Sequence, residues 1–255
     1  MVSHSSQRNL GKEFLEFLIR GVVIAKKDAK IYYFKPQIFG FGILIPAFVY
    51  LSFSLGRELS PTLLVPGLVG MVSLFGASSI EAISIPIERQ TETYELLQIA
   101  PVSTRTIIFG KSLAGSAFGI VLSLGTALAA VLLTFSSVAN VFLFVLAAVI
   151  GAFVFSAFGM LVAAAAKDMP TANMSLTALR LPMIFISGVF IPVLSLPLPL
   201  QVISYFSPLT YIINALRDAM VAPSIAFAVN VAVLLAWLVV FQTLAVVVLN
   251  KKTKI

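Results

Sequence analysis

The sequence contains no cysteine and a single histidine, His4, among its 255 residues. Without cysteine there is no disulfide, no thiolate nucleophile and no cysteine-ligated metal, and one histidine in a polar N-terminal stretch offers no cluster of metal ligands. We therefore expect no redox chemistry, no histidine-based catalysis and no bound metal.

Charged residues are also scarce, at 11% of the chain, whereas 60% of the residues are hydrophobic and the mean hydropathy is +1.06. A soluble domain carries about a quarter charged residues because its surface faces water. The composition excludes both a soluble globule and a disordered chain, and indicates a protein dissolved in lipid. Basic residues outnumber acidic ones by 17 to 10, but they gather at the ends of apolar segments, so no nucleic-acid partner is expected.

Long apolar runs dominate the rest of the sequence. A bilayer core about 30 Å thick needs roughly 20 apolar residues in a helix, and six stretches meet this length. We expect an all-α, polytopic membrane protein with a single six-helix transmembrane domain over residues 36–249. The predicted spans are Pro36–Gly56, Thr62–Ile87, Thr106–Thr134, Asn140–Ala166, Met174–Leu194 and Ser224–Leu249.

The distribution of basic residues predicts the orientation. An even number of spans places both termini on one side. Seven basic residues precede the first span, three lie in the tail 250–255, five lie on or near the other inner ends, and only Arg57 and Arg217 fall outside. By the positive-inside rule both termini are cytosolic, in the plasma or inner membrane.

The first 35 residues form a separate amphipathic segment. Glu16 and Arg20 interrupt its apolar run and no small-residue cleavage site follows, which argues against a signal peptide. Apolar residues recur at steps of three and four, as in a helix lying in the headgroup plane with its lysines attracted to anionic lipid. The alternative is a solvated charged arm.

Residues 195–223 are too apolar for a loop in water and too broken for a span. The segment holds four prolines, including Pro208, together with Arg217 and Asp218. Two short re-entrant helices on the outer side fit this pattern, because irregular backbone at membrane depth must be covered by protein or reached by water. A surface loop folded over the bundle is the alternative.

Two apparent catalytic motifs fail. Gly110-Lys111-Ser112 resembles the end of a phosphate-binding loop, but that loop needs a glycine where this chain has Arg105. Ser187 lies in a span without an activating base, so a serine hydrolase is excluded. The chain itself is expected to bind no nucleotide or other cofactor and not to be an enzyme.

Small residues in the third span predict close helix packing. Gly115 and Gly119 have the small-xxx-small spacing, and Ser112 and Ser116 extend the same face.

Two charges inside spans are more informative. Glu81 and Arg180 each lie about six residues, or roughly 9 Å, inside a cytosolic helix end. Since isolated charges in lipid are costly, an intramembrane pair is one hypothesis and independent extension of both side chains to the headgroups is the other.

The loop after the second span, residues 88–105, is the most distinctive polar segment. As a helix stopped by Pro101, it places Glu88, Glu92 and Glu95 on one side, next to Tyr94 and Leu97. Apolar side chains exposed to water here would be unfavourable unless a membrane or a partner protein covered them. The pattern predicts a docking surface.

These motifs resemble those of the permease subunits of type-2 ABC transporters. The loop pattern is matched by Glu88-Arg89, Thr93, Glu95, Leu97 and Pro101-Val102-Ser103, with Gln90 where a second acid is usual. The fifth span ends in Phe185-Ile186-Ser187-Gly188-Val189-Phe190-Ile191-Pro192, and Ser207-Pro208-Leu209-Thr210-Tyr211 and Ala215-Leu216-Arg217 follow in the family's order.

The resemblance implies an ATP-driven exporter in which two permeases, identical or related, work with two ATPase subunits that bind the ATP and Mg. The loop would then be the coupling segment. Its predicted contact residues are Glu88, Arg89, Thr93, Tyr94, Glu95, Leu97, Pro101 and Ser103. In such families the second and fifth spans form the dimer interface.

That interface would line the substrate pathway with large apolar side chains and few hydrogen-bonding groups, which favours a hydrophobic drug or lipid as cargo. The predicted pathway residues are Leu68, Met71, Phe75, Phe185 and Phe190. A lipid-linked polysaccharide is the alternative cargo. A stand-alone secondary transporter or membrane scaffold is the alternative class of protein.

Overall fold

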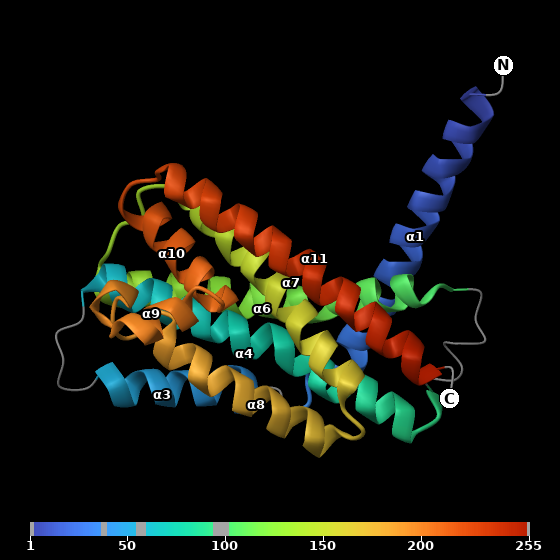
Figure 1. Ribbon diagram of the computed structural model, residues 1–255, viewed down its shortest axis with the longest axis horizontal. Coiled ribbons are helices and arrows are strands. Elements are labelled where there is room, and N and C mark those ends of the chain that lie inside the picture. Colours follow the sequence, from blue (N-terminus) through green and yellow to red (C-terminus); the bar gives the residue numbers. More distant parts are fainter. Residues whose placement is uncertain (1–2, 37–39, 55–59, 94–101, 254–255) are drawn as a thin grey trace.

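The computed structural model describes residues 3–36, 40–54, 60–93 and 102–253, and within them every regular element is a helix (Figure 1). The prediction of an all-α protein is confirmed. In chain order the elements are α1 Ser3–Tyr32, the π-helical turn η1 Gly40–Leu44, α3 Ile45–Ser54, α4 Pro61–Gln90, α6 Thr104–Thr134, α7 Val141–Ala165, α8 Met169–Ile186, the 3₁₀ turn η2 Val193–Ser195, α9 Leu198–Ser204, α10 Pro208–Val221 and α11 Ile225–Thr253.

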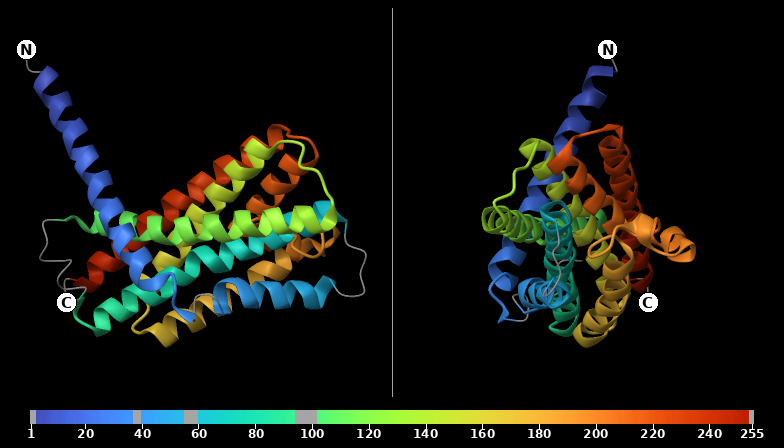
Figure 2. Two further views of the ribbon diagram at one scale, coloured as in Figure 1. Left: turned by 180° about the vertical axis from the view of Figure 1, so that it is seen from behind. Right: turned by 90° about the vertical axis from the view of Figure 1, so that its left-hand side faces the viewer.

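Helix α4 forms the centre of the bundle. It packs against α6, α7, α8, α10 and η1, and nearly every side chain from Val65 to Pro86 is buried (Figure 2). The sequence of α4 permits this because small residues are spread along its whole length, including Gly67, Gly70 and Gly76. A movement at either end of α4 therefore displaces side chains that pack against α6, α7, α8 and α10.

Four helices, α4, α6, α7 and α11, are long and apolar enough to cross a membrane. Their observed bounds lie within about four residues of the predicted second, third, fourth and sixth spans. The predicted first span corresponds to η1 and α3, and the predicted fifth to α8. Both run beside α4 (Figures 1 and 2). The six-span count stays a prediction.

The predicted fifth span has the wrong bounds. Helix α8 begins five residues earlier than expected, where the Asp168 side chain accepts a hydrogen bond from the Thr171 backbone N–H at 2.8 Å. It ends at Ile186, eight residues early, because Gly188 follows with φ +83° and reverses the chain. Only glycine adopts that conformation freely.

Residues 195–223 contain two short helices, α9 and α10, as expected. Pro208 starts α10 behind Ser207, whose hydroxyl accepts a hydrogen bond from Ser187 at 2.7 Å. Tyr211 donates to the Tyr205 carbonyl at 2.8 Å, and Arg217 donates to the Gly188 carbonyl at 3.3 Å. The bonds to Ser187 and Gly188 hold α10 against the end of α8, and the bond to Tyr205 holds it against the end of α9. Whether the two helices are re-entrant stays a prediction.

Helix α1 leaves the bundle at an angle, and its C-terminal half packs on α6 (Figures 1 and 2). Its apolar residues Leu15, Ile19, Val22 and Val23 are all more than half exposed. An exposed apolar face of this size is typical of a helix that lies against lipid.

Helix α1 begins beyond the same end of the bundle at which α4, α7 and α11 end and α6 and α8 begin (Figure 1). This arrangement agrees with an even number of crossings.

Candidate functional site

The base of the predicted coupling loop lies at this end of the bundle. Glu88 and Arg89 belong to the last turn of α4, Thr93 follows that helix, and Ser103 precedes α6. The predicted contact residues Tyr94, Glu95, Leu97 and Pro101 lie outside the described residues. The structure therefore shows how the loop is anchored at both ends.

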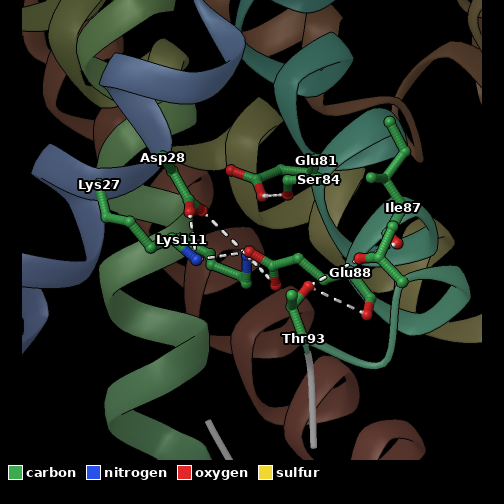
Figure 3. A network of polar contacts seen from close by, with 9 residues as sticks. Lys27, Asp28, Glu81, Ser84, Ile87, Glu88, Thr93 and Lys111 are labelled. Atoms are coloured by element: carbon green, nitrogen blue, oxygen red, sulfur yellow. Dashed lines mark hydrogen bonds and ion pairs between the residues drawn. The ribbon is translucent and has the colours of Figure 1, made fainter. Parts of the chain in front are cut away.

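Four charged side chains from three helices form what we term the inner ion network: Lys27 and Asp28 of α1, Glu88 of α4 and Lys111 of α6 (Figure 3). Lys111 Nζ lies 2.9 Å from an Asp28 carboxylate oxygen and 2.7 Å from a Glu88 oxygen. Lys27 Nζ contacts the other oxygen of each carboxylate, at 2.9 Å and 2.5 Å. Two positive and two negative charges balance.

The network is almost completely removed from solvent. The side chains of Lys111 and Asp28 are 0% exposed and that of Glu88 is 4% exposed, whereas Lys27 is 36% exposed at the edge. Removing one partner from such a cluster leaves an uncompensated buried charge, which is far more costly than the pair itself. The network thus binds α1, α4 and α6 to one another just where the loop begins.

Close helix crossing makes the network possible. A Cβ added to Gly110 would lie 2.7 Å from the Gly21 carbonyl oxygen, so α1 and α6 touch backbone to backbone at this point. Lys111 follows Gly110 directly, and Asp28 lies two turns along α1 from Gly21, on the same face. Sequence reasoning missed Lys111 as a functional residue. The available signal was a lysine inside a predicted span together with an acid in the preceding amphipathic helix.

Arg89 points away from this network toward α7. Its guanidinium donates to the Ala166 carbonyl at 3.1 Å and to the Ala164 carbonyl at 3.4 Å. These carbonyls end α7, where the helix has unpaired acceptors and a partial negative charge. Arg89 therefore links the last turn of α4 to the end of α7.

The remaining described loop residues complete the anchor. Thr93 donates to the Glu88 carbonyl at 3.3 Å, after Glu92 has turned the chain with φ +59°. On the other side, the Ser103 hydroxyl accepts a hydrogen bond from the Thr106 N–H at 3.2 Å and caps the start of α6. The predicted contact residues Glu88 and Arg89 are thus bonded to other helices of the permease at the base of the loop, and their contact with an ATPase stays a prediction.

Glu81 and Arg180 do not form the predicted pair. Arg180 of α8 is fully buried, donates to Ser78 Oγ at 2.5 Å and lies 4.9 Å from the centre of the Phe75 ring. Glu81 instead accepts hydrogen bonds from Ser156 of α7 at 3.2 Å and from Ser84 at 3.5 Å.

Helix geometry explains this difference. Six residues separate Phe75 from Glu81, which places them about 120° apart around α4 at 3.6 residues per turn. Arg180 packs on the Phe75 side of α4, whereas Glu81 faces α6 and α7. Similar depth along the helix was therefore not enough to bring the two charges together.

The predicted pathway residues separate into two groups. Met71 and Phe75 are 0% and 1% exposed inside this chain, and Phe75 is covered by Arg180, so neither side chain faces open space. Leu68 is partly buried against the core. Phe185 is 47% exposed, and its ring centre lies 6.2 Å from that of the mostly buried Phe190. Among the predicted pathway residues, Phe185 at the end of α8 is therefore the one with an accessible aromatic ring.

Within the described residues, no group of three or more histidine or acidic side chains gathers where a metal ion would bind.

Comparison with known proteins agrees with these features. The family described as ABC-2 type transporter matches residues 14–221, which include most of α1, the loop and α10. Two relatives from Escherichia coli, strains K12 and O157:H7, each named "Probable multidrug ABC transporter permease YbhR", are 25% identical to this chain over 150 residues. The matched region is 58% of this chain and 40% of each relative. Because the family match covers well over half of the residues, the chain belongs to the ABC-2 type transporter family of membrane permeases.

Proposed function

We propose that this chain is the permease subunit of an ATP-driven exporter and works with a separate ATPase that binds ATP and Mg. The observation that carries the proposal is the anchoring of the loop that follows α4. Its first residues are tied to α1 and α6 through the inner ion network and to α7 through Arg89. A force applied to the loop is thereby shared among four helices.

The mechanism follows from the rigidity of that anchor. An ATPase seated on residues 94–101 moves the loop when it closes on ATP. Because the ends of the loop are bonded into the bundle, the displacement passes to the central helix α4. The helices around α4 then move with it, and the pathway between two permeases opens outward.

Replacing Leu97 with aspartate is expected to uncouple the complex. In the proposed docking surface Leu97 is covered by the ATPase, and a carboxylate there loses its water without gaining a partner, which costs several kcal/mol. The permease should be purified in mild detergent, and the amount of bound ATPase and the rate of transport measured.

Gln90→Asp is the matched control, since Gln90 is exposed on the last turn of α4. It should retain both the ATPase and transport. Normal ATPase binding and transport by Leu97→Asp would refute the docking role. Purification of wild-type permease without any ATPase would favour a stand-alone transporter or scaffold.

The proposed topology has six crossings with both termini in the cytosol. It is supported by the shared location of the start of α1 and the end of α11, by η1, α3 and α8 beside α4, and by the excess of basic residues at that end.

Cysteine labelling tests this orientation on a background that has no native cysteine. An impermeant maleimide applied to intact cells should label Ser137→Cys, between α6 and α7, and should label Thr91→Cys only after the cells are opened. Both positions are exposed in the structure. The reverse pattern would invert the topology.

The proposed cargo is a hydrophobic or amphipathic drug or lipid that passes between two permeases. The exposed aromatic surface of Phe185 beside Phe190 supports an apolar cargo, as does the multidrug description of the E. coli relatives. A lipid-linked polysaccharide is the alternative, since aromatic rings also stack on sugars.

Hydrophobic amphiphiles should stimulate the ATPase of the reconstituted complex in proportion to their apolar surface. Phe185→Ala should weaken that stimulation severalfold by removing contact area. Phe142→Ala is the matched control, because Phe142 is 74% exposed at the far end of α7. Stimulation by a lipid-linked glycan, with no response to amphiphiles, would reverse the choice of cargo.

A further inference from the structure

A groove of about 500 Å³ lies between α1 and α11, over the first turns of α6. Its floor is Phe109 of α6, which is held in place by α1: a Cβ added to Gly21 would lie 2.8 Å from the Phe109 ring, and the Phe17 ring lies 5.0 Å from it. The size is that of a pocket for a small molecule or part of a lipid. The groove borders the C-terminal end of the coupling loop, where Arg105 lies in the first turn of α6, and it is separate from the proposed pathway.

The lining of the groove is divided by polarity. Phe17 and Phe109 on one side and Val246 and Val247 on the other form apolar walls. The polar groups are Arg105 near the start of α6 and three uncharged side chains of α11, Gln242, Thr243 and Asn250. The described lining contains no carboxylate, so the only charge in the groove is positive.

Arg105 is available to a ligand. Its side chain is exposed, and among the described residues no hydrogen bond or ion pair engages its guanidinium. A neighbouring arginine shows the contrast, since Arg89 is already bonded to the carbonyls that end α7. An arginine at the rim of an apolar groove matches a molecule with a phosphate at one end and hydrocarbon at the other.

We infer that this groove binds one anionic phospholipid, with its phosphate on Arg105 and an acyl chain along Phe109 and Val247. The inference rests on the proposed function only in placing the site in the cytosolic leaflet, because Arg105 lies at the same end of the bundle as the loop. Charge complementarity favours an anionic headgroup. The phosphate of a zwitterionic lipid is neutralised by the cation of the same headgroup, whereas the phosphate of an anionic lipid keeps its net charge and pairs with the Arg105 guanidinium. A bound lipid would bridge α1 and α11, both of which pack on α6.

Tryptophan quenching by brominated lipids tests the site in the intact permease. The chain has a single tryptophan, Trp237, which lies on α11 away from the groove. The reporter is Val247→Trp in a Trp237→Phe background, since Val247 is 44% exposed in the groove wall. Bilayers of phosphatidylcholine receive a minor fraction of either brominated phosphatidylglycerol or brominated phosphatidylcholine. The ratio of quenching by the first lipid to quenching by the second gives their relative affinity for the site.

Phosphatidylglycerol should bind at the Val247→Trp reporter about fivefold more tightly than phosphatidylcholine, as one basic residue near the surface provides. The native Trp237 should report a ratio near one. Arg105→Gln should abolish the preference at the Val247→Trp reporter, and Arg105→Lys should retain most of it. Lys251→Gln, which removes an exposed charge outside the groove lining, is the matched control and should leave the ratio unchanged.

Equal ratios at the two reporters, or a preference that survives Arg105→Gln, would overturn the site and identify the groove as ordinary lipid-facing surface. The bilayers are symmetric and contain neither ATP nor ATPase, so the result does not depend on the topology or on coupling. Failure of the lipid site is therefore distinguishable from failure of the proposed function.

Discussion

Replacing Lys111 with methionine is expected to destabilise the permease by about 3–5 kcal/mol, because it leaves one of the two buried carboxylates, Asp28 and Glu88, without a compensating positive charge. Lys27 still contacts both acids, but it is partly exposed and supplies one positive charge against two negative charges. The measurement is the free energy of unfolding of the purified permease in mild detergent, with thermal inactivation of the complex alongside it.

Two controls separate the network from the loss of a lysine. Lys26→Met removes an exposed lysine beside the network and should change stability little. Adding Asp28→Asn and Glu88→Gln to Lys111→Met removes the stranded negative charges and should restore much of the lost stability. If Lys111→Met is no worse than Lys26→Met, the ion pairs do not hold the three helices together.

Glu88→Gln is expected to weaken the coupling between ATPase and transport more than it weakens the folding of the permease. The substitution keeps the shape of the side chain but weakens its contacts with both lysines, so the last turn of α4 is held less firmly. The network supports an anchoring role for Glu88 in the proposed mechanism, and the predicted contact of Glu88 with the ATPase stays a prediction.

The long apolar helices were predictable from the sequence because each is a long apolar run with few charged residues to interrupt it. Helices α4, α6, α7 and α11 each consist of a nearly unbroken apolar run of at least 25 residues, and their predicted and observed bounds agree within about four residues. Hydrocarbon leaves the backbone no alternative to helical hydrogen bonds. The predicted fifth span was harder because Gly188, with its positive φ, ends α8 inside an apolar run.

The side-chain partners inside the bundle were not predictable, since they depend on how helices are rotated about their axes. Glu81 and Arg180 lie at similar depths but on different sides of α4. Lys111 meets Asp28 only because Gly21 and Gly110 let α1 and α6 touch. Length and charge patterns fix a residue's depth in the membrane, whereas rotation follows from packing.

The small-residue face of α6 was predicted correctly and gives the second large effect. Replacing Gly119 with valine is expected to destabilise the permease by about 2–3 kcal/mol, the cost of overpacking a close-packed core. An added Cβ would lie 2.5 Å from the Ala77 Cβ and 3.0 Å from its Cα. Backbone atoms of α4 cannot yield without moving the helix, so thermal unfolding should shift downward.

Gly125 on the same helix supplies a matched control, because a Cβ added there meets nothing within 4 Å. Gly125→Val should be neutral or slightly stabilising, since both variants gain the same helix propensity over glycine. Exchanging the two residues, with Gly119→Ala and Ala77→Gly together, removes the Cβ–Cβ collision and should recover part of the loss, though the Ala77 Cα and N at 3.0 Å and 3.1 Å remain close.

Equal stability of Gly119→Val and Gly125→Val would mean that α4 and α6 do not pack as closely as the structure has them. A loss confined to Gly119→Val, accompanied by weaker coupling to the ATPase, would connect the position of α4 to the work of the loop, because α6 begins where that loop ends.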